Sequence, residues 1–289
     1  MSDYDLAILH FDENVLHPEN CGGYIEPRWG NAFKWFSNNV NLPKIAICHG
    51  TPQFYGQYSS AFVEQKDIKI IESSRKELVE FTRDMLVITN SHQANHEWEF
   101  NTSKTIWQGF DPIEYPKATY KKGILSLGKP MKERPHYRGY FTYQDTQKHL
   151  LKDVTMDSLV VPDPVGYSPQ TNPFAYLKYR NYVDAIRQYS IYFNPTLRSP
   201  MPRSRGEAMM CGLVTVSADN HDVNMFIDNG VNGFYSNNPQ ELADYLTYLL
   251  KNPDKLRSIG QRSRDTACDV FNHDNYLEQW FQTIKGILK

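Results

Sequence analysis

Residues 190–217 of this chain, SIYFNPTLRSPMPRSRGEAMMCGLVTVS, give the most informative pattern for its fold. The first seven of these residues form a short apolar run that ends before a polar loop, and residues 213–217 form a second run, as in buried β-strands. Between them, residues 206–212 combine good helix formers with Gly212, which suits a helix C-cap. A strand, a helix and a second strand in this order predict a parallel sheet covered by helices.

Three arginines precede the helix, in the loop at residues 198–206. We expect this loop to leave the carboxyl end of a strand and to lead into a helix N-terminus, where free backbone N–H groups and the helix dipole favour an anion. Arginine adds paired donors for phosphate oxygens, and Glu207, expected in the first helical turn, can accept the hydroxyls of a ribose. The pattern suits a nucleoside diphosphate. The alternative is a solvated loop in which Glu207 caps its own helix.

Length and composition indicate a folded protein of two domains. The 289 residues exceed the length of one typical domain, and 40% hydrophobic with 22% charged residues is typical of chains that bury a core. The net charge of −2 argues against a general nucleic-acid-binding protein, which would carry a basic face. We therefore expect no nucleic-acid partner.

The cysteines and the apolar runs indicate a cytoplasmic protein. Cys21, Cys48, Cys211 and Cys268 are far apart and form no CxxC pair, so we expect reduced thiols. The N-terminus shows no signal-peptide pattern, and no run approaches the roughly 18 apolar residues of a membrane span. Peripheral contact with the inner face of a membrane stays open.

Strand and helix patterns alternate along most of the chain. A helix is expected at residues 73–84, with Ser74 and Glu77 as a capping box, and the proline-containing segment 109–123 is interpreted as a hinge. The expected strands lie at residues 5–11, 44–50, 85–91, 105–110, 123–128, 158–164, 190–196, 213–219 and 233–236.

The C-terminal third shows the clearest helix signals. Residues 175–189 carry one apolar stripe, and later helices are expected to begin at Asn238-Pro239, at Asn252-Pro253 and near residues 272–275. We expect residues 1–115 to form a short N-terminal acceptor-side domain and residues 116–270 to form a nucleotide-sugar-binding domain. Residues 271–289 are expected to form a helix that returns to the first domain. A ligand would lie in the crevice between the domains.

Residues 206–264 resemble a known family. The segments EAMMCGLVTV, DNGVNGFY and NNPQELADYLTYLL match, in order and spacing, the C-terminal domain of retaining, nucleotide-sugar-dependent GT-B glycosyltransferases. The bacterial group that this domain resembles includes sucrose synthases and phosphatidylinositol mannosyltransferases. The resemblance implies an α/β protein of GT-B fold, with two Rossmann-like domains whose parallel sheets face each other across a cleft.

The resemblance also implies a donor site. Glu207 matches the family's second motif glutamate, which binds the ribose hydroxyls. The first glutamate, expected eight residues earlier, is replaced by Ser199. Either Ser199 and the neighbouring backbone take over its contact with the donor sugar, or the enzyme is unusual or impaired. We favour the first, and we expect Arg203, Arg205 and Gly206 to belong to the same donor-binding loop.

The family's diphosphate clamp is matched with changes. Lys129 takes the place of an arginine after a strand, Arg138 replaces a lysine before Gly139, and Arg134 could serve instead because the loop is longer. Cations here would neutralise the charge that develops on the leaving diphosphate. The alternative is a basic surface loop.

On the N-terminal side, the resemblance makes His49 the residue that faces the donor sugar. Gly50 and Thr51 would bring backbone and hydroxyl donors close to it. A structural histidine at the end of a strand is the alternative.

The N-terminal half contains a candidate metal site and one departure from the family. His92 and His96 are four residues apart, with Glu97 adjacent, and this pair could bind a metal on one helix face. No further ligand lies at a recognisable spacing, so we expect no metal. The hinge comes early, and Cys21-Gly22-Gly23 is a weak substitute for the family's glycine-rich acceptor loop. The chain is therefore either a compact variant or one that lacks an initial segment.

The expected function is transfer of a sugar from a nucleoside-diphosphate donor to a glycan, lipid or small-molecule acceptor. The resemblance implies retention of configuration and chemistry that needs neither metal nor cofactor. Two alternatives stay open: a degenerate, non-catalytic nucleotide-sugar or glycan-binding protein, and a GT-B UDP-sugar epimerase, which would need carboxylates in the cleft.

Overall fold

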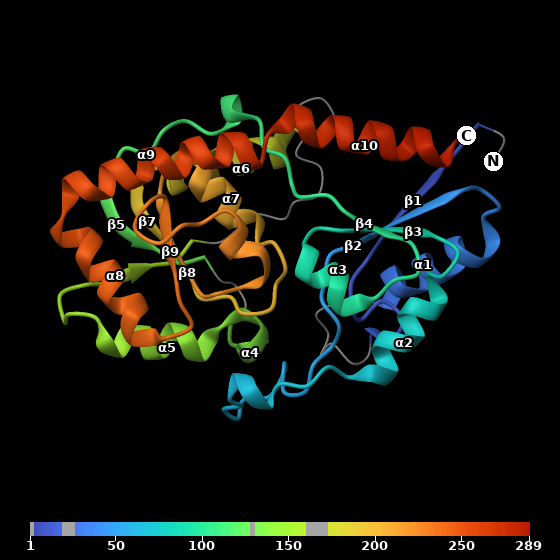
Figure 1. Ribbon diagram of the computed structural model, residues 1–289, viewed down its shortest axis with the longest axis horizontal. Helices are drawn as coiled ribbons and strands as arrows, with labels where there is room; N and C mark the ends of the chain where they lie inside the picture. The colour runs from blue at the N-terminus through green and yellow to red at the C-terminus, as the bar shows by residue number, and fades with distance from the viewer. Residues whose placement is uncertain (1–2, 19–26, 128–130, 160–172) are drawn as a thin grey trace.

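Two parallel sheets, one from each half of the chain, lie at opposite ends of the molecule (Figure 1). The structure is a computed structural model, and it describes residues 3–18, 27–127, 131–159 and 173–289. Helices cover both sheets, so the α/β fold class expected from the alternating pattern is confirmed.

The N-terminal sheet has the strand order β1-β2-β3-β4, with every pair parallel. Its strands are β1 (Ala7–Phe11), β2 (Lys44–Cys48), β3 (Leu86–Thr89) and β4 (Ser103–Thr105), and its helices are α1 (Pro27–Asn39), α2 (Glu72–Phe81) and α3 (His92–Trp98). Leu9 and Ala46 pack against Phe33 of α1 and Leu78 of α2 on one face. Along β1, buried and more exposed side chains alternate, as expected for a strand with one covered face.

The C-terminal sheet has the order β6-β5-β7-β8-β9, again all parallel. Its strands are β5 (Lys122–Leu125), β6 (Met156–Asp157), β7 (Tyr189–Asn194), β8 (Val214–Ser217) and β9 (Gly233–Tyr235). Its helices are α4 (Pro135–Arg138), α5 (Tyr140–His149), α6 (Pro173–Ile186), α7 (Arg203–Cys211), α8 (Pro239–Lys251) and α9 (Pro253–Val270). The described residues also include the 3₁₀ turns η2 (Gln65–Asp67), η3 (Pro112–Glu114) and η4 (His221–Met225). Strand β7 is buried along its whole length, as a central parallel strand should be.

The last helix, α10 (His273–Ile287), extends from the C-terminal half across to the N-terminal sheet (Figure 1). Its residues Tyr276 and Trp280 pack against Ile45 and Ile88, on the face of the sheet opposite α1 and α2. The described part of the chain contains no helix that is both long and apolar enough to cross a membrane. The domain boundaries expected above stay a prediction.

Several local predictions are confirmed. The side chain of Asn238 caps α8 by accepting from the N–H of Gln240, and that of Asn272 caps α10 by accepting from the N–H of Asn275. Gly212 ends α7 with a φ of 84°, the left-handed conformation that glycine adopts most easily.

Two predicted helix starts are wrong. Helix α2 begins at Glu72, and its N-cap is Ile71, which makes no side-chain capping bond, so Ser74 and Glu77 form no capping box. The reason is tertiary: the N–H of Ile71 donates to the carbonyl of Gln53 at 2.8 Å, which holds Ile71 extended and lets the helix start directly after it. Helix α7 begins at Arg203, so Glu207 lies in its second turn.

One strand prediction is shifted, and another is only partly testable. Strand β4 ends at Thr105, where the predicted strand 105–110 begins. The aromatic residues that suggested a strand there, Trp107 and Phe110, instead pack into the C-terminal core. Strand β6 at Met156–Asp157 precedes the predicted strand 158–164, whose residues 160–164 lie outside the described residues.

Candidate functional site

The two halves of the chain meet through loops, several of which follow the carboxyl ends of strands. Glu13, just after β1, contacts Arg134 of the C-terminal half. Thr51 follows β2 and donates to the carbonyl of Arg198, which follows β7, at 3.4 Å. Binding sites in open parallel sheets form at such strand ends, so the junction is the candidate site.

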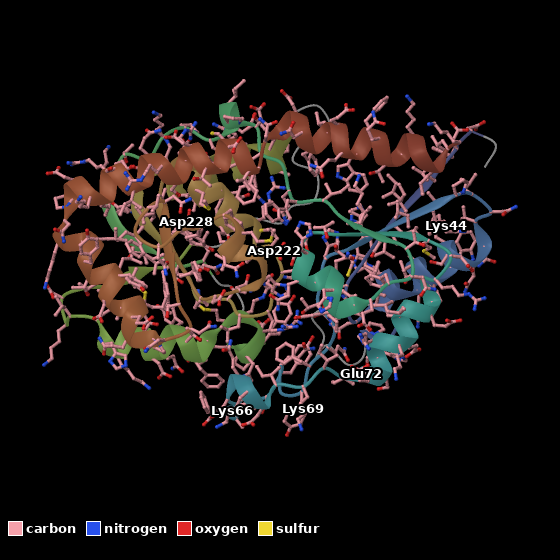
Figure 2. All side chains as sticks on the ribbon, viewed as in Figure 1. Lys44, Lys66, Lys69, Glu72, Asp222 and Asp228 are labelled. Carbon is pink, nitrogen blue, oxygen red and sulfur yellow. The ribbon has the colours of Figure 1, made fainter. Side chains whose placement is uncertain are left out.

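Asp222 forms the densest contact across the junction. Its carboxylate accepts from the backbone N–H of His92 at 2.6 Å and of Gln93 at 3.0 Å, the first residues of α3. The indole N–H of Trp107 donates to it at 2.8 Å, and Ser91 Oγ lies 3.2 Å away. A carboxylate of the C-terminal half thus compensates the dipole of α3 in the N-terminal half. Figure 2 shows Asp222 between the two halves.

A second contact joins Arg198 to Glu97. The guanidinium donates to both carboxylate oxygens, one of them at 2.9 Å, and both side chains are mostly buried. Burial alone would raise the pKa of Glu97, but the hydrogen bonds and charge of Arg198 hold that pKa below its usual range. Glu97 is therefore tied to Arg198, which is a role other than the metal ligation considered from the sequence.

His221 supports the same loop. Its Nε2 donates to the carbonyl of Arg198 at 3.0 Å, so Nδ1 is free to accept from Ser91 Oγ, 3.1 Å away. Burial lowers the pKa of His221 to about 4, with the nearby charge of Arg198 as the next cause. Its φ of 48° is unusual for a residue other than glycine and indicates that the surrounding contacts hold it in place.

Glu13 and Arg134 form an ion pair that is almost fully buried, with side-chain exposures of 1% and 3%. The guanidinium also stacks on the ring of Tyr137, 3.6 Å from its centroid. Gly50 makes this possible, because a Cβ there would lie 1.8 Å from Glu13 Oε2. The structure thus places Arg134 and Gly50 in a junction contact between the two halves of the chain. Their role in donor binding stays a prediction.

Glu207 is a buried carboxylate surrounded by donors. The phenol of Tyr179 donates to Oε1 at 2.9 Å, that of Tyr182 to Oε2 at 3.0 Å, and Nε of Arg203 to Oε1 at 2.8 Å. Tyr115 hydrogen-bonds in turn to Tyr179. Burial and the charge of Glu207 raise the pKa values of all three tyrosines, so the phenols stay protonated and act as donors.

A small pocket of about 230 Å³ opens beside this cluster. It is lined by Gly109, Phe110, Asp111, Glu114, Tyr115, Tyr176, Tyr179, Arg203 and His273. The volume is below the range of about 300–1,000 Å³ that is typical of ligand sites. Glu207 itself is buried and does not line this pocket, so a ligand reaches it only if the tyrosines or Arg203 move.

Arg205, in contrast to Arg203, is completely buried. Its guanidinium lies 5.2 Å from the ring centroid of Phe226 and donates to Asn220 Oδ1 at 3.3 Å, and burial lowers the pKa of Arg205 to about 10. Asn220 donates in turn to the carbonyl of Ser199 at 3.0 Å. Arg205 thus supports the loop at position 199 from within the core.

Arg138 and the loop after β7 are brought together by Gly139. The backbone of Gly139, with a φ of 72°, approaches Pro195 so closely that a Cβ would lie 1.7 Å from its carbonyl oxygen. Arg138 lies next to this contact, at the end of α4. Lys129, the other cation expected in the clamp, lies outside the described residues, as do Cys21, Gly22 and Gly23.

His49 lies at the end of β2 beside His10. Their ring nitrogens are 2.8 Å apart and the rings stack. The pKa of His49 is lowered to about 4, because the surrounding protein displaces water and because His10 lies beside it. His49 is therefore a neutral hydrogen-bonding group at pH 7.

Glu13, Asp222 and His221 were not among the site residues predicted from the sequence. All three follow strand ends, and the polar run after β8 was a visible signal for the last two.

Among the described residues, no group of three His, Cys, Asp or Glu side chains could hold a metal ion. Gly206 lies under Phe110, where a Cβ would be 2.4 Å from the ring.

The matches to known proteins agree with this geometry. Residues 161–282 match the family model described as glycosyl transferase-like. HepE of Anabaena, solved with UDP-glucose, has a TM-score of 0.64 at 15% identity, over 98% of this chain and 79% of HepE. None of the curated protein sequences matches the chain significantly.

Two further solved structures show the same fold. Sucrose-phosphate synthase of Thermosynechococcus elongatus has a TM-score of 0.68 at 11% identity, over 98% of this chain and 74% of that protein. A glycosyltransferase of Rickettsia africae has a TM-score of 0.61 at 15% identity, over 100% of this chain and 78% of that protein. The expected fold and the resemblance that suggested it are confirmed.

Proposed function

We propose that this chain is a GT-B glycosyltransferase that transfers a sugar from a nucleoside-diphosphate sugar to an acceptor hydroxyl with retention of configuration and without a metal. In this reaction the bond from the anomeric carbon to the diphosphate breaks and a bond to the acceptor oxygen forms. The proton of the acceptor leaves with the diphosphate. Catalysis then depends on positioning and on stabilising the negative charge of the leaving group.

The observation that carries the proposal is the set of hydroxyls on Glu207. One phenol donates to each carboxylate oxygen, at 2.9 and 3.0 Å, which is the arrangement that two neighbouring ribose hydroxyls would adopt. Tyr179 and Tyr182 thus occupy the positions that we assign to the ribose. Glu207 also lies within the segment 161–282 that matches the family model.

The remaining roles follow from position. Arg203 borders both Glu207 and the adjoining pocket, so we assign it to the donor. We assign Arg138 and Lys129 to the diphosphate, and neutral His49 to hydrogen bonds with the sugar. We assign Ser199 and Thr51 to the same donor site, together with the loop that Arg205 supports from below.

A binding screen tests the proposal. We expect one member of a set of UDP-, GDP-, dTDP- and ADP-sugars to raise the stability by about 2.7 kcal/mol at one hundred times its Kd. UDP-glucose is the first choice, because HepE was solved with it. Retention is checked from the anomeric configuration of the product by NMR. Failure of all donors to shift the melting temperature would contradict the nucleotide site.

A second candidate is a non-catalytic nucleotide-sugar-binding protein. Ser199 supports it, because this position offers no carboxylate to the donor sugar. The two are separated by incubating the protein with its donor alone, since a slow transferase releases nucleotide by hydrolysis and a pure binder releases none. An epimerase would instead convert the sugar-nucleotide into its epimer.

A further inference from the structure

A groove of about 710 Å³ runs along β1 and ends at the candidate site. One wall is strand β1, whose described pairing is with β2 alone, and the other wall is helix α1. The lining residues are Tyr4, Leu6, Ala7, Ile8, Leu9, His10, Phe11, Asp12, Val15, Trp29, Ala32, Phe33, Phe36, Val40, Leu42 and His49. We call this cavity the β1 groove.

Apolar side chains line most of the β1 groove, and three large ones among them are exposed to solvent. The exposed fraction of the side chain is 60% for Trp29, 44% for Ile8 and 43% for Phe36. Trp29, Phe33 and Phe36 on α1, and Val40 directly after it, recur every three to four residues, so one stripe of the helix faces both the core and the groove. Large exposed apolar areas of this kind mark binding sites.

The polar groups gather at one end. His10 and His49 lie against each other with their nitrogens 2.8 Å apart, and Asp12 also lines the groove there. Burial and the neighbouring charge of Glu13 raise the pKa of Asp12 to about 7. The groove is therefore amphipathic: hydrogen-bonding groups lie at the candidate site and hydrocarbon lies farther along.

The shape and position favour a small ligand over a protein partner. The volume lies within the range of about 300–1,000 Å³ typical of small-molecule sites. The groove is continuous with His49, so an occupant of its apolar part would hold its polar end at the site where sugar is transferred.

We propose that the β1 groove binds the apolar portion of an amphiphilic acceptor, a molecule whose hydroxyl lies at His10, Asp12 and His49 and whose hydrocarbon lies between β1 and α1. The inference rests on the proposed function, because it names the acceptor class of that reaction. Trp29, Phe36 and Ile8 set this preference by contact with the hydrocarbon.

The test compares n-octyl and methyl β-glucoside, two probes with the same polar head, by titration calorimetry below the micelle concentration. Each buried methylene changes affinity about fourfold, so burial of three gives roughly 60-fold tighter binding of the octyl compound. Phe36→Ser and Ile8→Ser should reduce this ratio to a few-fold. Phe174→Ser is the matched control, because Phe174 is 80% exposed and does not line the groove.

Equal binding of the two probes, or an octyl preference that survives both groove substitutions, would overturn the proposal. So would a dimer in light scattering that Phe36→Ser converts to the 33.6 kDa monomer, because the groove would then be an interface between copies. The shift of melting temperature by UDP-glucose is measured on the same variants. An octyl preference without any nucleotide-sugar binding would contradict the proposed function alone, and intact donor binding without the preference would contradict the groove alone.

Discussion

The carboxylate of Asp222 accepts the backbone N–H of His92 at 2.6 Å, so a residue of the C-terminal half caps a helix of the N-terminal half. Removing the carboxylate leaves the first N–H groups of α3 without this acceptor. We expect Asp222→Ala to lower the free energy of unfolding by about 2–3 kcal/mol. Urea denaturation measures the loss, and hydrogen exchange should rise at both α3 and η4.

Asp228→Ala is the control for this variant, since Asp228 is exposed on the same half (Figure 2). It should change stability by less than about 0.5 kcal/mol. Equal losses for the two variants would show that the contact between the halves contributes little.

Substitutions of Glu207 and Tyr182 should change the affinity for the donor in opposite directions. Glu207→Gln removes the charged acceptor and should weaken the donor by roughly 10- to 100-fold, as expected for hydrogen bonds to a charged group. Tyr182→Phe removes the phenol that occupies Oε2, so it should strengthen binding by about 2- to 10-fold. Titration calorimetry with the donor found in the screen measures both. Weaker binding in both variants would mean that Tyr182 contacts the donor rather than competing with it.

The lowered pKa of His221 should make the free energy of unfolding depend on pH. This pKa is about 4 in the folded protein against 6.5 as a free group, so the unfolded chain binds the proton more readily. This contribution is fully present above pH 6.5 and is lost as the pH falls toward 4. The whole shift corresponds to about 3 kcal/mol.

The check on His221 is the slope of unfolding free energy between pH 7 and pH 4. His221→Asn should flatten this slope, and asparagine tolerates the φ of 48° at this position. His273→Asn, at a partly exposed position on α10, should keep the slope of the unchanged protein. A slope that His221→Asn leaves unchanged would assign the titration to other groups.

Gly50 and Gly286 offer a matched pair of alanine substitutions. A Cβ at Gly50 would lie 1.8 Å from Glu13 Oε2, so Gly50→Ala should displace Glu13 from Arg134 and destabilise the protein by about 1–3 kcal/mol. At Gly286, near the end of α10, no described atom lies within 4 Å of the new Cβ. Gly286→Ala should be neutral or stabilising by up to about 1 kcal/mol. Thermal unfolding of both variants measures the difference.

The element order and the helix ends could be predicted because they depend on nearby residues. Asn238 caps α8 through an N–H two residues away, and Asn272 caps α10 through one three residues away. Gly212 ends α7 through its own backbone conformation. The start of α2 could not be predicted in this way, because a hydrogen bond from Ile71 to Gln53, 18 positions earlier, sets it.

The candidate site shows the same division. The α/β alternation and the place of Glu207 in a recognisable motif follow from the amino-acid sequence, since apolar periodicity and motif spacing are local properties. The contacts of the charged residues depend on the folded chain: Arg198 pairs with Glu97 across 101 positions, and Asp222 caps α3 across 130. These partners meet because the two halves of the chain dock through loops, and no local pattern records which loops then face each other.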